Sequence, residues 1–142
     1  MTSKEIVKQI LANWKFPVLQ EGENSMVIRY QMNYVQIASL QEGSNAIAVT
    51  LNGIFTADDE REERLALKAA NEINYRLMQV KIYLDDDNDL AIASEFFYKS
   101  DDDVEFLLNY ALQAVVTAKK KFIQQYEAVV DEDKLIQELN NE

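Results

Sequence analysis

Apolar residues recur every three or four positions in two segments of the chain, which is the spacing of an amphipathic α-helix. The positions on the apolar faces are Ile6, Ile10 and Trp14 in the first segment, and Leu65, Ala69, Ile73 and Leu77 in the second. Because the residue before a proline disfavours helical backbone angles, Pro17 limits the first helix to about residues 3–15. The pattern therefore predicts an N-terminal helix and a second helix near the middle of the chain.

A third helical pattern is longer than the other two. Its apolar positions alternate at spacings of four and three residues and are Val104, Leu108, Ala111, Val115, Ala118 and Phe122. The pattern predicts a helix from about residue 101 to residue 129, which at 1.5 Å per residue would extend on the order of 40 Å. A sheet of ordinary strands is shorter than that, so part of this helix is expected to overhang the sheet.

Each predicted helix follows a hydroxyl residue and a carboxylate residue placed three positions apart, as in a capping box. The pairs are Thr2 with Glu5, Thr56 with Asp59, and Ser100 with Asp103. The acidic runs at 58–63 and 101–105 fall in first helical turns, where the helix dipole favours negative charge. We interpret the lysines at 119–121 by the same rule, as a solvated face toward the opposite end of the third helix.

The regions between these helices lack helical periodicity and contain short β-rich runs separated by turn residues. The runs lie at residues 18–20, 25–32, 34–40 and 45–55, and an alternating pair at 80–84 and 90–96 predicts a hairpin. The order α-β(3-4)-α-β-β-α indicates an α+β fold, with an antiparallel sheet packed with three helices. We expect one domain over residues 1–130 and an acidic C-terminal tail over residues 131–142.

The hairpin tip, Asp85 to Asp89, reads DDDND and raises the question of a cation site. An EF-hand loop that began at Asp85 would require Gly at its sixth position and Glu at its twelfth, but those positions hold Leu90 and Phe96. Asn and Asp tolerate left-handed backbone angles and bond to their own backbone, as a hairpin end requires. The sequence therefore favours a solvated turn over a weak cation site, and no metal site is predicted.

The sequence contains no Cys and no His. Thiolate nucleophiles, zinc–thiolate sites and His-based triads are thereby excluded. With only 3 Gly and 1 Pro, no Gly-rich phosphate loop can be assembled. We predict no catalytic residue and no cofactor, so a small enzyme that uses carboxylates, Lys or Tyr is the weaker alternative.

The formal net charge is -11. Such a charge repels phosphate backbones and anionic membrane surfaces, so neither a nucleic acid nor a membrane is an expected partner. The chain shows no run of 18 apolar residues and no signal-peptide pattern. We therefore expect a cytoplasmic protein.

Two aromatic residues lie off the apolar face of the third helix. At 100° per residue, Phe106 lies about 200° and Tyr110 about 240° from Val104. Their neighbours on that face are the polar residues Gln113, Thr117 and Gln124. Aromatic residues are enriched in protein contact surfaces, and the possible contact residues are Phe106, Tyr110, Leu67 and Met78.

The C-terminal segment carries Leu135, Ile136 and Leu139 at helical spacing. These residues could fold back over the overhanging helix or pack on a second chain. Since most soluble homo-oligomers have two-fold symmetry, a homodimer is the expected assembly.

Residues 58–126 resemble the YbjN family, whose members are described as candidate sensory transduction regulators of bacteria. The resemblance rests on the helix ALKAANEINYRL, the hairpin VKIYLDDDNDLAIASEF and the acid-led helix DDDVEFLLNYALQAV. Asn71 and Asn74 match the family's Asn-x-x-Asn helix, whereas Asn88 and Asp89 stand where a Gly is common at the hairpin tip. The resemblance implies a fold similar to type III secretion chaperones and a non-enzymatic bacterial protein that binds another protein.

Three hypotheses about function follow. The first is a chaperone-like or regulatory module that binds a protein of unknown identity. The second is an acidic antidote or immunity-type protein, whose charge would steer it onto a basic partner. The third, the carboxylate-based enzyme, has the least support.

Overall fold

The computed structural model describes residues 1–141 and contains three α-helices, one 3₁₀ turn and six strands within them. The helical elements are α1 (Ser3–Asn13), α2 (Glu60–Arg76), η1 (Asp101–Asp103) and α3 (Val104–Asn140). The strands are β1 (Gln20–Glu21), β2 (Met26–Tyr30), β3 (Asn33–Ala38), β4 (Ala46–Leu51), β5 (Lys81–Leu84) and β6 (Leu90–Phe97). The predicted α+β class and element order are confirmed.

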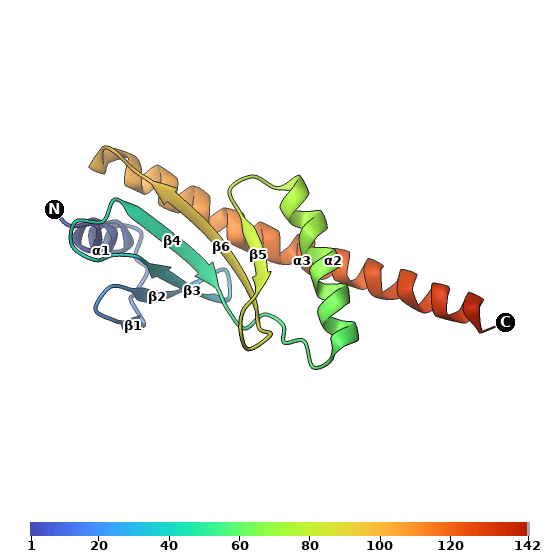
Figure 1. Cartoon of the computed structure of the whole chain (residues 1–142). Helices are drawn as coiled ribbons and strands as arrows, with labels where there is room; N and C mark the ends of the chain where they lie inside the picture. Colours follow the sequence, from blue (N-terminus) through green and yellow to red (C-terminus); the bar gives the residue numbers. More distant parts are fainter. Residues whose placement is uncertain (142) are drawn as a thin grey trace.

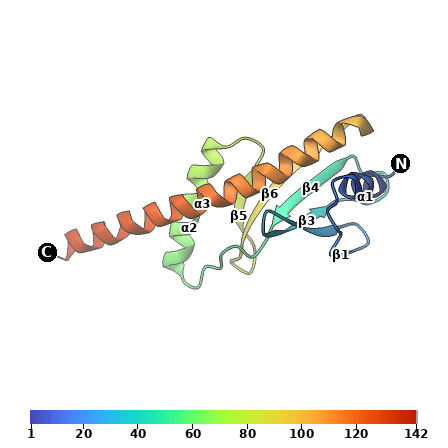
Figure 2. The same cartoon turned by 180° about the vertical axis from the view of Figure 1, so that it is seen from behind.

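The six strands form one sheet in the order β1-β2-β3-β4-β6-β5, with every neighbouring pair antiparallel. α3 runs along one face of this sheet, and α1 lies on the same side near the start of α3 (Figures 1 and 2). α2 lies beside β5, the last strand of the sheet, and also packs on α3. In both views α3 continues alone past the other elements toward the C-terminus.

The core lies between α3 and the sheet. Alternate strand residues face the helices and are buried, which is the two-residue period of a half-buried sheet; among them are Ile28, Val35, Ile47, Val49 and Ile92. The six apolar positions predicted on α3, from Val104 to Phe122, are all buried, as are Leu65 and Ile73 of α2. The predicted helical phases are therefore confirmed.

The predicted C-terminal end of the third helix is wrong. α3 does not end near Val129 but continues to Asn140. The segment after Val129 contains neither Gly nor Pro, the residues that most readily stop a helix. The division into a domain of residues 1–130 and a tail of residues 131–142 stays a prediction, although residues 131–140 are helical.

Of the three predicted helix caps, only that of α1 forms in full, where Thr2 and Glu5 make a reciprocal capping box. The hydroxyl of Ser100 accepts from the N–H of Asp102 and so caps the short η1 turn, whereas no side chain caps α3 and the predicted pairing of Ser100 with Asp103 does not form. The prediction for α2 is wrong by three residues, because the carboxylate of Asp59 caps this helix.

Thr56, the predicted cap of α2, is used elsewhere. Its hydroxyl donates to a carboxylate oxygen of Asp89 at the β5–β6 hairpin tip, and the two residues form an isolated β-bridge. The segment before α2 thus runs beside the hairpin tip, where Leu90 N–H also donates to the carbonyl of Phe55. Thr56 is therefore extended backbone beside the hairpin, and α2 begins only after Asp59.

The interpretation of the lysines at 119–121 as a dipole-complementing face is also wrong. Since α3 continues to Asn140, these lysines lie in the middle of the helix, and its last turn holds no basic residue. Lys119 instead donates from Nζ to the Oδ1 atom of Asn33 at 2.6 Å. Lys120 and Lys121 are exposed.

Candidate protein contact surface

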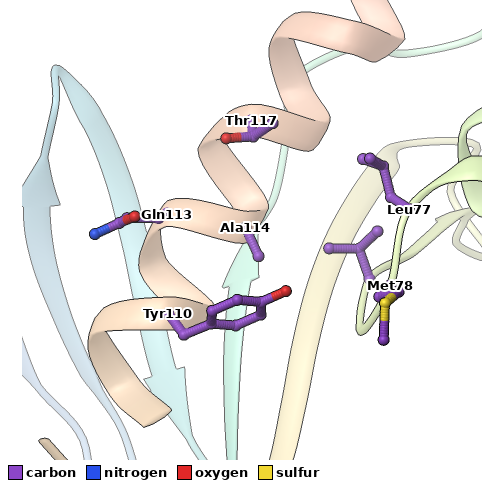
Figure 3. Close-up of a pocket in the computed structure, with 7 residues that line it drawn as sticks. Leu77, Met78, Tyr110, Gln113, Ala114 and Thr117 are labelled. Carbon is purple, nitrogen blue, oxygen red and sulfur yellow. The ribbon is translucent and has the colours of Figure 1, made fainter. Parts of the chain in front are cut away.

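A hollow of about 210 Å³ lies between α3 and the loop that follows α2. Figure 3 shows its lining residues, with Tyr110 and Ala114 on α3 pointing toward the loop and Gln113 pointing away from it. The full lining is Leu77, Met78, Val80, Tyr110, Gln113, Ala114 and Thr117. A mainly apolar lining with a few hydroxyl and amide groups is typical of a binding hollow.

The loop side of the hollow is shaped by the end of α2. The helix ends at Arg76, and Leu77 leaves it with an extended backbone. Gln79 then has a φ of 57°, a left-handed angle that reverses the chain direction before β5. This geometry packs Leu77 against the core and leaves Met78 78% exposed. An exposed, flexible Met side chain adapts well to a partner surface.

A second hollow continues along the same side of α3. It is lined by Ile73, Arg76, Leu77, Lys121, Gln124 and Gln125, and so shares Leu77 with the first hollow. From Tyr110 to Gln125 the two hollows follow α3 for roughly 22 Å at 1.5 Å per residue. We call these two hollows together the α3 groove.

The four predicted contact residues do not form one cluster. Met78 and Tyr110 line the same hollow of the α3 groove. Phe106 is 72% exposed and lies one helical turn before Tyr110, where it lines a separate hollow with Trp14. Leu67 is exposed on α2 and is not part of these three hollows within residues 1–141.

The sequence patterns missed part of the lining of the groove. Leu77, Val80 and Ala114 line the first hollow but were not predicted as contact residues. A signal for the helical part exists, because Ala114 follows Tyr110 by four residues and precedes Thr117 by three, which places them on one helical face. The loop residues carry no such periodic signal.

The hairpin tip forms the predicted turn. One carboxylate oxygen of Asp85 accepts from the N–H groups of Asp87 and Asp89, at 2.9 and 3.0 Å. Asn88 has a φ of 59°, in the left-handed region that Asn tolerates. Oxygens of Asp85, Asp87 and Asp89 lie within 4.8 Å of one another, but two of the three carboxylates already accept hydrogen bonds from the chain. The absence of a metal site stays a prediction.

Shifted pKa values occur away from the α3 groove. The hydrogen bond and positive charge of Arg61, with a further contribution from Arg64, lower the pKa of Asp133. The Lys8 ammonium likewise lowers the pKa of Glu21, and Glu95 raises the pKa of Lys81. These pKa shifts arise from surface ion pairs, so they give no indication of acid–base chemistry in the groove.

None of the helices within residues 1–141 combines the length and the apolarity needed to cross a membrane. The sequence matches no protein family model and no curated protein.

Solved structures do resemble this chain. YbjN from E. coli, described as a candidate transcription regulator, has a TM-score of 0.63 and 14% identity, covering 82% of this chain and 88% of that chain. The chain has the YbjN fold. An uncharacterised protein from Methanothermobacter thermautotrophicus has a TM-score of 0.61 and 16% identity, covering 89% of this chain and 97% of that chain. The Yersinia pestis type III secretion chaperone SycH, solved with a fragment of YscM2, has a TM-score of 0.48 and 10% identity, covering 80% and 97%.

Proposed function

We propose that this chain is a non-enzymatic, cytoplasmic protein-binding module with a regulatory or chaperone-like role. The observation that carries the proposal is the hollow between Met78 and Tyr110, which exposes apolar and aromatic side chains beside amide and hydroxyl groups. Aromatic residues and Met are enriched at the centres of protein interfaces. YbjN, which shares the fold, is described as a candidate transcription regulator, and this description favours a regulatory role.

The size of the first hollow suits a side chain of a protein partner better than a whole small-molecule ligand. Sites for drug-sized ligands usually enclose roughly 300–1,000 Å³, whereas this hollow measures about 210 Å³. That volume suits an anchoring side chain from a partner protein. The exposed amide of Gln124, in the adjoining hollow, can bind the backbone of such a partner.

The antidote or immunity-type role is the second candidate. A net charge of -11 favours a basic partner and fast, salt-dependent association. The acidic character is not concentrated at the first hollow, whose lining residues carry no charge. We therefore favour the regulatory or chaperone-like role. A homodimer remains the proposed assembly.

Site-specific photocrosslinking in the source cells tests the proposed function. A benzophenone amino acid placed at Tyr110 should capture a foreign protein, whereas the same group at Tyr75, which is 85% exposed on α2, is the matched control. Adding Met78→Asp should reduce capture at position 110, because a carboxylate would enter the apolar hollow. Equal capture from positions 75 and 110, or capture unchanged by Met78→Asp, would contradict the proposed contact surface.

Repeating the capture at low and high salt separates the two candidate roles. Capture that is lost at high salt favours the antidote-type role, since the screening length between exposed charges falls to about 3 Å at roughly 1 M salt. Capture that persists favours a partner held mainly by the apolar hollow.

A further inference from the structure

One exposed face of α3 carries a lysine in its first half and an aspartate in its second half. Two copies of this face would therefore have complementary charges if they packed antiparallel. Its positions fall within a strip about 80° wide at 100° per residue. Along the strip lie Thr117, Lys121, Gln124, Ala128, Asp131, Leu135 and Leu139, and all of them are exposed. The basic part therefore precedes the acidic and apolar part on the same face of one helix.

The charges on this face take part in no ion pair within the part of the chain that the structure describes. Among residues 1–141, no ion pair involves Lys120, Lys121 or Asp131. Nearby acidic residues of α3 are paired differently, since Asp133 binds Arg61 and Arg64 of α2. The strip thus exposes one positive charge, on Lys121, and one negative charge, on Asp131, on either side of its middle.

We infer that this strip binds the same strip of a second copy of the chain, with the two α3 helices antiparallel. This inference rests on the homodimer proposed above and assigns its interface. A two-fold axis between Gln124 and Ala128 would place Lys121 of each copy opposite Asp131 of the other. The same register places Thr117 opposite Leu135.

Charge decides between the two ways in which the strips can pair. Parallel strips would align lysines with lysines and carboxylates with carboxylates, and like charges that face each other disfavour an interface. Antiparallel strips place Lys121 of each copy opposite Asp131 of the other, on both sides of the two-fold axis. An isologous two-fold contact is also the commonest arrangement in homo-oligomers.

The apolar residues of the overhang agree with this arrangement. Leu135 and Leu139 are 57% and 61% exposed, beyond the last ion pair between α2 and α3 at Asp133. Residues 134–140 alone form only about 10 Å of helix, which is little surface against the ~800 Å² per partner of a typical stable interface. Antiparallel pairing from Gln113 to Leu139 would lengthen the contact to roughly 40 Å. It would also seat both leucines at the border of the α3 groove.

A charge exchange tests the interface directly. Lys121→Glu and Asp131→Lys should each weaken dimerisation at least several-fold, as measured by sedimentation at several concentrations of the full chain. The double variant keeps the net charge at -11 and restores the opposite charges across the axis, so it should dimerise like the wild type. Asp131→Lys also makes the chain less negative overall, so weakening by this variant cannot arise from general repulsion.

Introduced cysteines test the register, because the natural chain has none. The pair Thr117→Cys with Leu135→Cys should form disulfide-linked dimers under mild oxidation. The pair Thr117→Cys with Ile123→Cys is the control, since Ile123 is also exposed but lies outside the strip. Helical circular dichroism and the unfolding midpoint establish that each variant folds.

The results of these experiments distinguish the proposed dimer interface from the homodimer itself and from the proposed protein-binding function. A dimer that neither single charge reversal weakens would overturn this interface and leave the homodimer intact. A monomer at every concentration would overturn both, while capture of a foreign protein at Tyr110 would still support the protein-binding function. A foreign protein crosslinked to the strip of a monomeric chain would assign the surface to that partner instead of a second copy.

Discussion

The side chain of Asn74 on α2 binds both backbone groups of Ile82 on β5. Its Nδ2 atom donates to the carbonyl oxygen of Ile82 at 3.0 Å, and the N–H of Ile82 donates to its Oδ1 atom at 2.8 Å. β5 is the last strand of the sheet, and the free backbone groups of an edge strand readily pair with other chains. Asn74 therefore occupies the free backbone groups of Ile82 at this edge of the sheet. This contact gives a structural role to the second Asn of the Asn-x-x-Asn helix.

Replacing Asn74 by Ala should leave the N–H and carbonyl groups of Ile82 without protein partners. We expect a loss of about 1–3 kcal/mol in the free energy of unfolding, the usual cost of an unsatisfied polar group, measured by urea denaturation. Asn71→Ala is the matched control, because Asn71 is exposed one turn earlier on the same helix. The two variants losing equal stability would show that the edge contact contributes nothing measurable.

The sequence predicted the local features of the fold better than those that depend on distant contacts. The helical phases of residues 65–73 and 104–122 and the hairpin at 80–96 were correct, because periods of 3.6 and 2 are visible within one segment. The cap at Thr56 was wrong because Asp89, far away in the sequence, engages its hydroxyl. The predicted end of α3 was wrong because the helix continues beyond its last buried apolar residues.

In the candidate site too, the sequence predicted the local features but not those that depend on contacts between distant segments. The exposure of Phe106 and Tyr110 followed from their angles on the helix, and the structure has both exposed. That Met78 would face Tyr110 across a hollow depends on where the loop after α2 crosses α3. No pattern within either segment encodes that crossing.

The ion pair between Asp133 and Arg61 should make the carboxyl group of Asp133 titrate below its usual value of 3.8. Because the pKa is lowered in the folded state, this contribution to stability is present above 3.8 and is lost as the pH falls through the folded-state pKa. A carboxyl ¹³C titration by NMR measures the value directly. Arg61→Gln should raise the pKa of Asp133, whereas Arg76→Gln, which removes a separate pair with Glu72, should leave it unchanged.

Two neighbouring aspartates at the hairpin tip should differ in their effect on stability. Asp85→Ala removes an acceptor of two backbone N–H groups and should cost about 1 kcal/mol, the net value of such hydrogen bonds. Asp87→Ala removes an exposed carboxylate and should change stability by less than about 0.5 kcal/mol. Thermal denaturation of both variants measures the contrast, and a larger loss from Asp87→Ala would contradict this description of the turn.

The contact between α3 and the sheet should dominate the stability of the fold. Leu108 is fully buried on α3, so Leu108→Ala should cost about 2–5 kcal/mol through lost burial and the cavity that remains. Leu67→Ala makes the same chemical change at an exposed position of α2 and should cost far less. Chemical denaturation compares the two, and an unchanged midpoint for Leu108→Ala would mean that the helical phase is misassigned.

Two truncations should locate the C-terminal limit of the folded unit. Residues 134–140 are all exposed, whereas Asp133 holds Arg61 and Arg64 of α2. Deleting the chain after Asp133 should therefore change the unfolding free energy of the monomer by only about 0.5 kcal/mol.

Deleting the chain after Val130 also removes Asp133 and Glu132, which pairs with Lys68, and should loosen the packing of α2 on α3. Hydrogen exchange of the α2 amides measures that loosening, because local opening exposes amides without global unfolding. Unchanged protection after the longer deletion would mean that the unit ends at Val130, as the sequence pattern predicted.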